Sequence, residues 1–407
     1  MGTVTADRPL AAVFLLPGRG ARLSSRAMNP MLGWGEYAPW FHAAALSGAT
    51  SYAFDTVAGR HVVLLFHGSA RHAPSIAALS LVAANRALFD DERACFFGVT
   101  VDPEDVRAGL ISQQLPGIRF FLDFDRKVSA LYGALASQSE YRPHWLVLDP
   151  ALRVAGRFGI DEGERALALL RARLAAPADG WAPVLVVPDV FEPDLCRHLI
   201  GLYEADGGEE SGFMRDVEGK TRLIVDPAHK QRRDYLIEDE TLRRGIVARM
   251  NRRLNTALER AFQFTPTRIE RYVVACYEAG RGYFRPHRDN TTKGTAHRRF
   301  AVTINLNAED YSGGDLRFPE FGPRTYRAPT GGAVVFSCTL LHEAMPVTRG
   351  RRFAFLPFLY DEAAARVREA SNPHLGEGVG EYRMRGPAAA GAKAGRKPGR
   401  RKSRAPR

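Results

Sequence analysis

The 407-residue sequence predicts two folded domains of different classes, an α/β domain followed by an antiparallel β domain. Between about residues 28 and 175, buried strand-like runs alternate with helical patterns, which is typical of an α/β layered domain. Over 183–365, short strand-like runs are separated by Gly-Gly or Pro-Gly pairs at hairpin spacing, which is typical of an antiparallel double-sheet barrel. Residues 1–27 and 366–407 show neither pattern, so we expect a loose N-terminal extension and a flexible tail.

In the first domain, apolar runs bounded by turn residues predict the strands, and longer periodic segments predict the helices. The predicted strands cover 61–68, 94–102, 119–125 and 144–150. The predicted helices cover 75–89, 103–115, 126–135 and 162–175. We expect a short linker over 176–182, which leads into the second domain.

In the second domain, His287, Asp289 and His342 form a candidate metal site. Ligands at i and i+2 on a strand point to the same face, so a His-x-Asp segment can present an imidazole and a carboxylate to one metal. His342, 53 residues after Asp289, completes a two-His-one-carboxylate set. This set is typical of non-haem Fe(II) oxygenases, where it leaves positions for a bidentate oxo-acid and O2. Arg352 offers a permanently charged, planar fork for the far carboxylate of such an acid.

The same three letters, H-R-D at 287–289, also begin the catalytic loop of protein kinases. That loop needs an asparagine five residues after the aspartate to hold a second magnesium, and this chain has Gly294 there. No glycine-rich phosphate loop precedes the segment and no D-F-G follows it, which excludes a kinase.

Three motifs of the second domain carry a family resemblance. They are VACY followed by a glycine-rich turn and H-x-D-N, the strand GGDLRF, and L-H-E-x-x-P-V-T-x-G-x-R at 341–352. Through them, residues 183–361 resemble the prolyl 4-hydroxylase-like branch of the Fe(II)/2-oxoglutarate-dependent dioxygenases. The resemblance implies a double-stranded β-helix, also called a jelly roll, for this domain.

The resemblance also implies a role for each site residue. The three metal-site residues match the family's iron ligands, Arg352 matches the partner of the C5 carboxylate of 2-oxoglutarate, and Tyr277 matches a phenol that hydrogen-bonds that carboxylate. Arg351 is the alternative to Arg352, but neighbours on a strand face opposite ways, so only one of the two points inward. The family's spacing favours Arg352.

The implied activity is hydroxylation of a substrate C–H bond, with release of succinate and CO2. The family's cofactor and cosubstrates are Fe(II), 2-oxoglutarate and O2, with L-ascorbate as a candidate reductant. The expected substrate is a prolyl residue of a peptide or protein, and the alternative substrate is a small molecule. Two departures bear on the substrate class: Asn305, Leu306 and Asn307 stand where relatives carry Tyr-Leu-Asn, and Phe358 stands where many carry tryptophan.

The first domain resembles the peroxiredoxin branch of the thioredoxin fold in the stretches VVLLFHG, GVTVDPED, FFLDFDRKVSALYG and RPHWLVLDP. Ser75 occupies the position of that family's peroxidatic cysteine, and peroxide reduction requires a low-pKa thiolate. Cys95 is expected to be a small buried hydrophobe, and a peroxidase using it is a weaker alternative. Pro143 matches the family's loop, where we expect a cis-proline. This domain therefore resembles a peroxiredoxin scaffold that lacks peroxidase chemistry. A further alternative function for the chain is that of a redoxin-like adaptor with a basic tail.

The net charge of +12 lies mainly in the tail, because residues 386–407 contain eight Lys or Arg and no acid, which leaves 12 − 8 = +4 for the rest. The Ala, Gly and Pro content of this stretch predicts disorder. Binding of nucleic acid or an acidic partner through phosphate neutralisation is one interpretation. An incidental tail is favoured, since no aromatic residue is interleaved to stack on bases.

The four cysteines lie far apart with no C-x-x-C pair, which argues against a disulfide framework or a structural zinc site. We therefore expect a reducing compartment, the cytoplasm. No apolar run approaches the length that spans a bilayer, and the early stretch AAVFLL is too short for a secretory signal. The sequence gives no indication of the oligomeric state.

Overall fold

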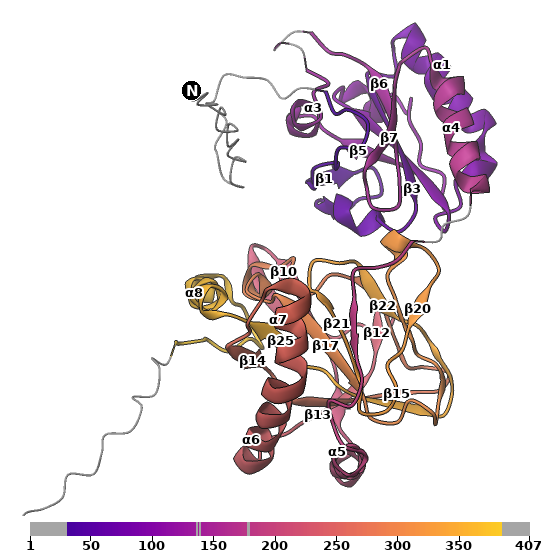
Figure 1. The fold of residues 1–407 in the computed structure, drawn as a ribbon. Helices are drawn as coiled ribbons and strands as arrows, with labels where there is room; N and C mark the ends of the chain where they lie inside the picture. The colour runs from indigo at the N-terminus through magenta and orange to yellow at the C-terminus, as the bar shows by residue number, and fades with distance from the viewer. Residues whose placement is uncertain (1–30, 136, 138–139, 177–179, 385–407) are drawn as a thin grey trace, which may run out of the picture. The chain divides into compact units, whose positions relative to one another are not determined.

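The computed structural model describes residues 31–135, 137, 140–176 and 180–384 (Figure 1). The expected N-terminal extension and the basic stretch from 386 lie outside these residues. The chain divides into two compact units, Met1–Ala176 and Pro177–Arg407.

The first unit is a mixed sheet with helices packed on it, as predicted for an α/β layered domain. The strands run in the order β2-β1-β5-β4-β3-β6-β7, and the pairs β3–β4 and β4–β5 are parallel. The strands are β1 (His42–Ala45), β2 (Tyr52–Ala53), β3 (His61–Gly68), β4 (Ala94–Thr100), β5 (Ile118–Leu122), β6 (His144–Leu148) and β7 (Val154–Gly159). The helices are α1 (Ala73–Ala84), α2 (Glu104–Arg107), α3 (Lys127–Leu131) and α4 (Gly163–Ala175).

Helices α1 and α4 lie side by side and cover one face of this sheet (Figure 1). Their apolar sides bury Val82 and Leu170 against strand residues such as Val63 and Trp145, which are fully buried. Burial of a side chain of this size contributes about 1.5–3 kcal/mol, so this layer forms the core of the unit.

Three expectations for the first unit were wrong in detail. The helix expected over 103–115 ends at Arg107, because Gly109 adopts a left-handed backbone (φ +64°) that favours helix termination. The helix expected over 126–135 ends at Leu131, just before Gly133 (φ +73°). The described cis peptide bond precedes Pro116 and not Pro143.

The second unit is built of antiparallel strands in two main sheets. The larger sheet has the order β14-β25-β17-β24-β15-β13-β9, with β21 and β8 attached through β17, and the smaller has the order β12-β16-β22-β19-β20. The strands of the first half are β8 (Leu185–Val187), β9 (Glu209–Glu210), β10 (Phe213–Val217), β11 (Lys220–Ile224), β12 (Lys230–Gln231), β13 (Arg233–Leu236), β14 (Arg268–Glu270), β15 (Val273–Glu278) and β16 (Tyr283–His287). Those of the second half are β17 (Phe300–Asn305), β18 (Ser312–Gly313), β19 (Leu316–Arg317), β20 (Thr325–Tyr326), β21 (Ala333–Ser337), β22 (His342–Ala344), β23 (Val347–Arg349), β24 (Arg351–Phe355) and β25 (Phe358–Tyr360).

Alternation along the strands of the larger sheet separates two cores. On one face, Val274 and Phe355 pack with residues of the helices α5 (Pro193–Asp206), α6 (Glu240–Arg249) and α7 (Thr256–Phe262). On the other face, Ala275 and Ala354 pack with Phe284 of the smaller sheet. The space between the two sheets is therefore the interior of the domain, as expected for a double-sheet barrel.

The tail begins later than the sequence predicted. Helix α8 (Glu362–Ala370) crosses the expected boundary at 365, and the chain beyond it stays attached to the second unit. Asn372 exchanges two hydrogen bonds with the backbone of Tyr382, whose ring lies 4.4 Å from the guanidinium of Arg368. A β-bridge joins Leu375 to Thr221 of β11. The expectation that residues 366–385 are flexible was therefore wrong as far as residue 384.

The described end of the expected linker also belongs to the second unit. The Gly180 amide donates to the Phe321 carbonyl over 2.9 Å, and the Ala182 amide donates to the Tyr326 hydroxyl over 2.8 Å. Among the described helices, none combines the length and apolar character that crossing a membrane requires.

Candidate metal centre

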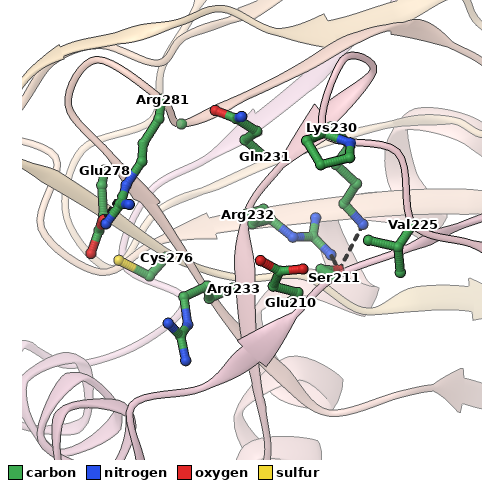
Figure 2. Close-up of a pocket in the computed structure, with 12 residues that line it drawn as sticks. Glu210, Ser211, Val225, Lys230, Gln231, Arg232, Arg233, Cys276, Glu278 and Arg281 are labelled. Atoms are coloured by element: carbon green, nitrogen blue, oxygen red, sulfur yellow. Dashed lines mark hydrogen bonds and ion pairs between the residues drawn. The ribbon is translucent and has the colours of Figure 1, made fainter.

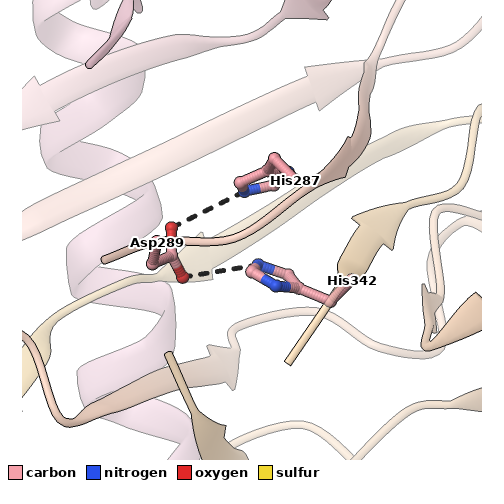
Figure 3. A group of neighbouring side chains, drawn as sticks. All are labelled: His287, Asp289 and His342. Atoms are coloured by element: carbon pink, nitrogen blue, oxygen red, sulfur yellow. Dashed lines mark ion pairs between the residues drawn. The ribbon is translucent and has the colours of Figure 1, made fainter. Parts of the chain in front are cut away.

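Two neighbouring strands of the smaller sheet bring the three predicted metal ligands together (Figure 3). His287 at the end of β16 lies directly opposite His342 at the start of β22. Asp289 follows two residues after β16, and its amide donates to the Cys338 carbonyl over 3.0 Å, which fixes the segment. One ligand atom from each of the three residues lies within 4.8 Å of the other two.

Backbone carbonyls orient both imidazoles toward the aspartate. Nδ1 of His287 lies 2.8 Å from the Arg285 carbonyl, and Nδ1 of His342 lies 3.1 Å from the Leu340 carbonyl. Because a carbonyl can only accept, each Nδ1 carries the proton and each Nε2 keeps its lone pair. The Nε2 atoms lie 3.6 Å and 3.4 Å from the two carboxylate oxygens of Asp289. This arrangement of carbonyl partners behind the ligating nitrogens is typical of metal-binding histidines.

Apolar rings surround the three side chains. Phe284 stacks on His287 with ring centroids 3.4 Å apart, and Phe336 lies 4.5 Å from His342. Burial lowers the pKa of His287 to about 4. Burial alone would raise the pKa of Asp289, but His342 and His287 hold it below its usual range. At neutral pH the site therefore offers the neutral imidazole of His287 and the carboxylate of Asp289, the protonation states that a divalent metal requires of such ligands.

Arg352 and Tyr277 lie opposite each other on the adjacent strands β24 and β15. Arg352 is 2% exposed, and its Nε and Nη1 bond no atom of the described residues. Its guanidinium lies 4.9 Å from the centre of the Tyr277 ring. Arg351, the alternative, is exposed and forms an ion pair with Glu204 over 2.6 Å. A buried cation with free donors is therefore present where the sequence predicted an anchor for a carboxylate.

Comparison with known proteins gives the family of the second unit. Residues 272–360 match the model of the 2OG-Fe(II) oxygenase superfamily. A PKHD-type hydroxylase of Synechococcus sp. (strain JA-2-3B'a(2-13)) is 35% identical over 181 residues, which cover 42% of this chain and 75% of that protein. The chain belongs to the PKHD-type hydroxylases. It is a 2-oxoglutarate-dependent dioxygenase.

Further similarities of this PKHD-type hydroxylase are more distant. A PKHD-type hydroxylase of Pseudomonas fluorescens (strain Pf0-1) is 31% identical over 186 residues, covering 42% of this chain and 75% of that protein. A solved prolyl-4-hydroxylase of Pseudomonas putida is 19% identical with a TM-score of 0.34, covering 44% of this chain and 94% of that one. The solved peroxidoxin BcpB of Mycobacterium tuberculosis is 20% identical with a TM-score of 0.31, covering 35% of this chain and 97% of that one.

Two cavities of the hydroxylase meet at the metal-site residues, since His287 and Asp289 line both. The smaller, about 50 Å³, extends toward Tyr277 and Arg352. The larger, about 100 Å³, extends toward Phe213 on the hairpin β10–β11. The site can therefore admit one molecule from the arginine side and another from the hairpin side.

The sequence did not identify five cations that line these cavities: Lys230, Arg232, Arg271, Arg288 and Arg298. Lys and Arg are usually solvated, and only the i, i+2 spacing of Arg232 and Asp234 could have indicated one buried ion pair. Asn305 and Asn307, which stand where relatives carry Tyr-Leu-Asn, hydrogen-bond backbone groups of the same unit.

Proposed function

We propose that His287, Asp289 and His342 hold Fe(II) in this hydroxylase. The observation that carries the proposal is the convergence of their three ligand atoms within 4.8 Å, with both Nε2 lone pairs free. Two imidazoles and one carboxylate are the donor set that non-haem iron enzymes use, and they leave metal positions open for other ligands. The bound metal supplies the activation of O2 that couples conversion of 2-oxoglutarate into succinate and CO2 to hydroxylation of a C–H bond.

We further propose that Arg352 binds the C5 carboxylate of 2-oxoglutarate. Its Nε and Nη1, which lack partners among the described residues, can donate two charge-assisted hydrogen bonds to that group. The Tyr277 hydroxyl accepts a hydrogen bond from Arg232 over 3.2 Å, so its own proton remains available for the same carboxylate. These residues orient the cosubstrate, and the aromatic rings around the ligands exclude water.

The proposed substrate is a prolyl residue of a peptide or protein. The motif resemblance to prolyl 4-hydroxylases supports this choice, and the cavity on the hairpin side has apolar walls at Phe213, Met214 and Phe284 that suit a pyrrolidine ring. A reducing compartment such as the cytoplasm suits the four cysteines, which are all free and buried.

For the first unit we propose a peroxiredoxin-type scaffold without peroxide chemistry. Ser75 lies in the first turn of α1, where its buried hydroxyl donates to the His67 carbonyl over 2.8 Å. Cys95 lies inside β4, and burial raises the pKa of its thiol to about 12. Because peroxide reduction needs a thiolate, neither side chain can perform it at neutral pH.

The test is succinate formation from 2-oxoglutarate by anaerobically purified protein, loaded with Fe(II) and then exposed to O2 with ascorbate present. His342→Ala is expected to abolish both succinate formation and Fe(II) retention. His198→Ala, which removes an exposed imidazole from α5, should change neither and serves as the matched control. Equal succinate formation by the wild type and His342→Ala would refute the assigned site. Mass spectrometry of host proteins should reveal one added oxygen atom on proline.

A further inference from the structure

Besides Arg352, five cationic side chains line the cavities next to the metal site: Lys230, Arg232, Arg271, Arg288 and Arg298. Arg232 pairs with Asp234 over 2.6 Å, Arg298 with Glu270 over 2.7 Å and Arg288 with Glu320 over 2.9 Å. Lys230 and Arg271 form no ion pair with any acid of the described residues, and Asp234 acts on both only through space.

Arg271 is held at the junction of the two cavities and lines both of them. Its Nε donates to the Leu356 carbonyl over 3.2 Å, and its guanidinium lies 4.4 Å from the centre of the Phe358 ring. Its two terminal nitrogens donate no hydrogen bond to a described residue. The backbone of Arg271 is left-handed (φ +57°), a conformation that is unfavourable for residues other than glycine. The fold therefore maintains a strained residue that presents free donors to the cavity.

Lys230 supports the same positive region from the hairpin side. Its Nζ donates to the Ser211 hydroxyl over 2.7 Å, as Figure 2 shows, and to the Gly212 carbonyl over 2.6 Å. It also lies 4.9 Å from the centre of the Phe284 ring. All these partners are neutral, so they position the ammonium without cancelling its charge.

Electrostatics indicates that both cations are poorly compensated. Burial lowers the pKa of Arg271 to about 10, and repulsion from the neighbouring Arg232 and Arg298 contributes to this shift. Burial also lowers the pKa of Lys230 well below its usual value, and repulsion from Arg232 contributes there too. Burying a charge without an ion-pair partner is unfavourable, and an anionic ligand would offset that cost.

The cosubstrate does not supply that anion. This step rests on the proposed function: Fe(II) contributes +2, Asp289 −1, 2-oxoglutarate −2 and Arg352 +1, which sums to zero. The positive charge of Arg271 is therefore still uncompensated when the metal and 2-oxoglutarate are bound. The remaining molecule that enters the cavity is the substrate.

We infer that Arg271, assisted by Lys230, binds a carboxylate of the substrate. This carboxylate lies close to the carbon that is hydroxylated, so the substrate is an anion. Two sources share this chemistry. One is the α-carboxylate of an imino acid, and the other is an acidic side chain next to proline in a peptide. A planar guanidinium with free terminal nitrogens matches a carboxylate in two hydrogen bonds.

The test is isothermal titration of full-length protein saturated with Zn(II) and N-oxalylglycine, an unreactive analogue of 2-oxoglutarate. The probes are two acid and amide pairs: N-acetyl-L-proline with its amide, and acetyl-Pro-Glu-amide with acetyl-Pro-Gln-amide. In the wild type, one acid is expected to bind at least tenfold more tightly than its neutral partner, and that pair identifies the source of the carboxylate. Arg271→Gln should bring the two affinities to within about twofold, whereas Arg271→Lys should keep part of the preference.

Arg366→Gln is the matched control, because Arg366 is an exposed cation on α8 and its loss changes the net charge equally. It should leave the preference unchanged, and equal effects of Arg271→Gln and Arg366→Gln would overturn the inference. Equal binding of acid and amide by the wild type, or no binding of either acid, would also overturn it. Succinate formation from 2-oxoglutarate tests the proposed function separately, since the wild type should turn over slowly without any of these probes.

Discussion

Replacement of Arg352 by glutamine is expected to weaken 2-oxoglutarate binding while Fe(II) binding is retained. Arg352 is 2% exposed, and two of its donors lack a partner among the described residues. Two charge-assisted hydrogen bonds of about 1.5 kcal/mol each would be lost, or about 3 kcal/mol together. At 1.36 kcal/mol per decade, this loss corresponds to a roughly 150-fold rise in the apparent KM for 2-oxoglutarate.

The assay measures succinate formation across a range of 2-oxoglutarate concentrations, together with iron content after anaerobic loading. Arg351→Gln is the matched control, because Arg351 is the neighbouring residue on the same strand and its partly exposed pair with Glu204 faces away from the cavity. Exposed ion pairs of this kind contribute about 0–1 kcal/mol to stability. The pair of Arg351 with Glu204 does not contact the site, so the apparent KM of Arg351→Gln for 2-oxoglutarate should match that of the wild type. A rise of less than about threefold in Arg352→Gln, or an equal rise in both variants, would refute the reasoning. Loss of iron from Arg352→Gln would mean that the arginine acts structurally.

Two predictions concern the first unit. Cys95→Ser is expected to leave hydrogen peroxide consumption unchanged. Burial raises the pKa of the Cys95 thiol to about 12, which leaves almost no thiolate at neutral pH. A fall in the measured rate of peroxide consumption would contradict the scaffold assignment. The second prediction concerns His67, because burial lowers the pKa of its imidazole to about 4. Between about pH 6.5 and 4, the unfolded chain therefore binds a proton that the folded unit does not. The free energy of unfolding falls as pH falls through this range. In urea unfolding at pH 4, His67→Leu should remove about 3 kcal/mol of this decrease in the free energy of unfolding. An unchanged pH dependence of the free energy of unfolding would show that another group titrates.

The fold of the first unit was predictable where apolar runs were continuous. The strands β3, β4 and β6 are buried along nearly their whole length, and each was expected from an unbroken hydrophobic segment. Strand β7 was not predicted, because two glycines and an arginine within VAGRFG interrupt the hydrophobic pattern. The overlong helix expected at 103–115 has the same origin, since local pattern does not show where one glycine adopts a left-handed backbone.

In the second unit, the sequence identified side chains whose chemistry is specific but not those whose role depends on burial. The candidate ligands His287, Asp289 and His342 were recognisable because few residue types ligate iron. Strand alternation allows only one of Arg351 and Arg352 to point inward, and the family's spacing favoured Arg352. Arg271 gave no comparable indication, because an arginine near a strand is normally solvated. Only the three-dimensional arrangement shows that Arg271 lines both cavities without forming an ion pair with an acid of the described residues.

The direct pairing of His287 with His342 on antiparallel strands means that backbone geometry fixes the spacing of the two imidazoles. Residues facing each other across such a pair have Cα atoms about 4.5–5.5 Å apart, so the donor separation follows from the ladder itself. A slip of β22 by one residue would turn His342 to the opposite face of the sheet and remove one imidazole from the centre. Insertions at the hairpin tips should thus be tolerated, whereas a single-residue deletion inside either strand should eliminate metal affinity even if the protein stays folded.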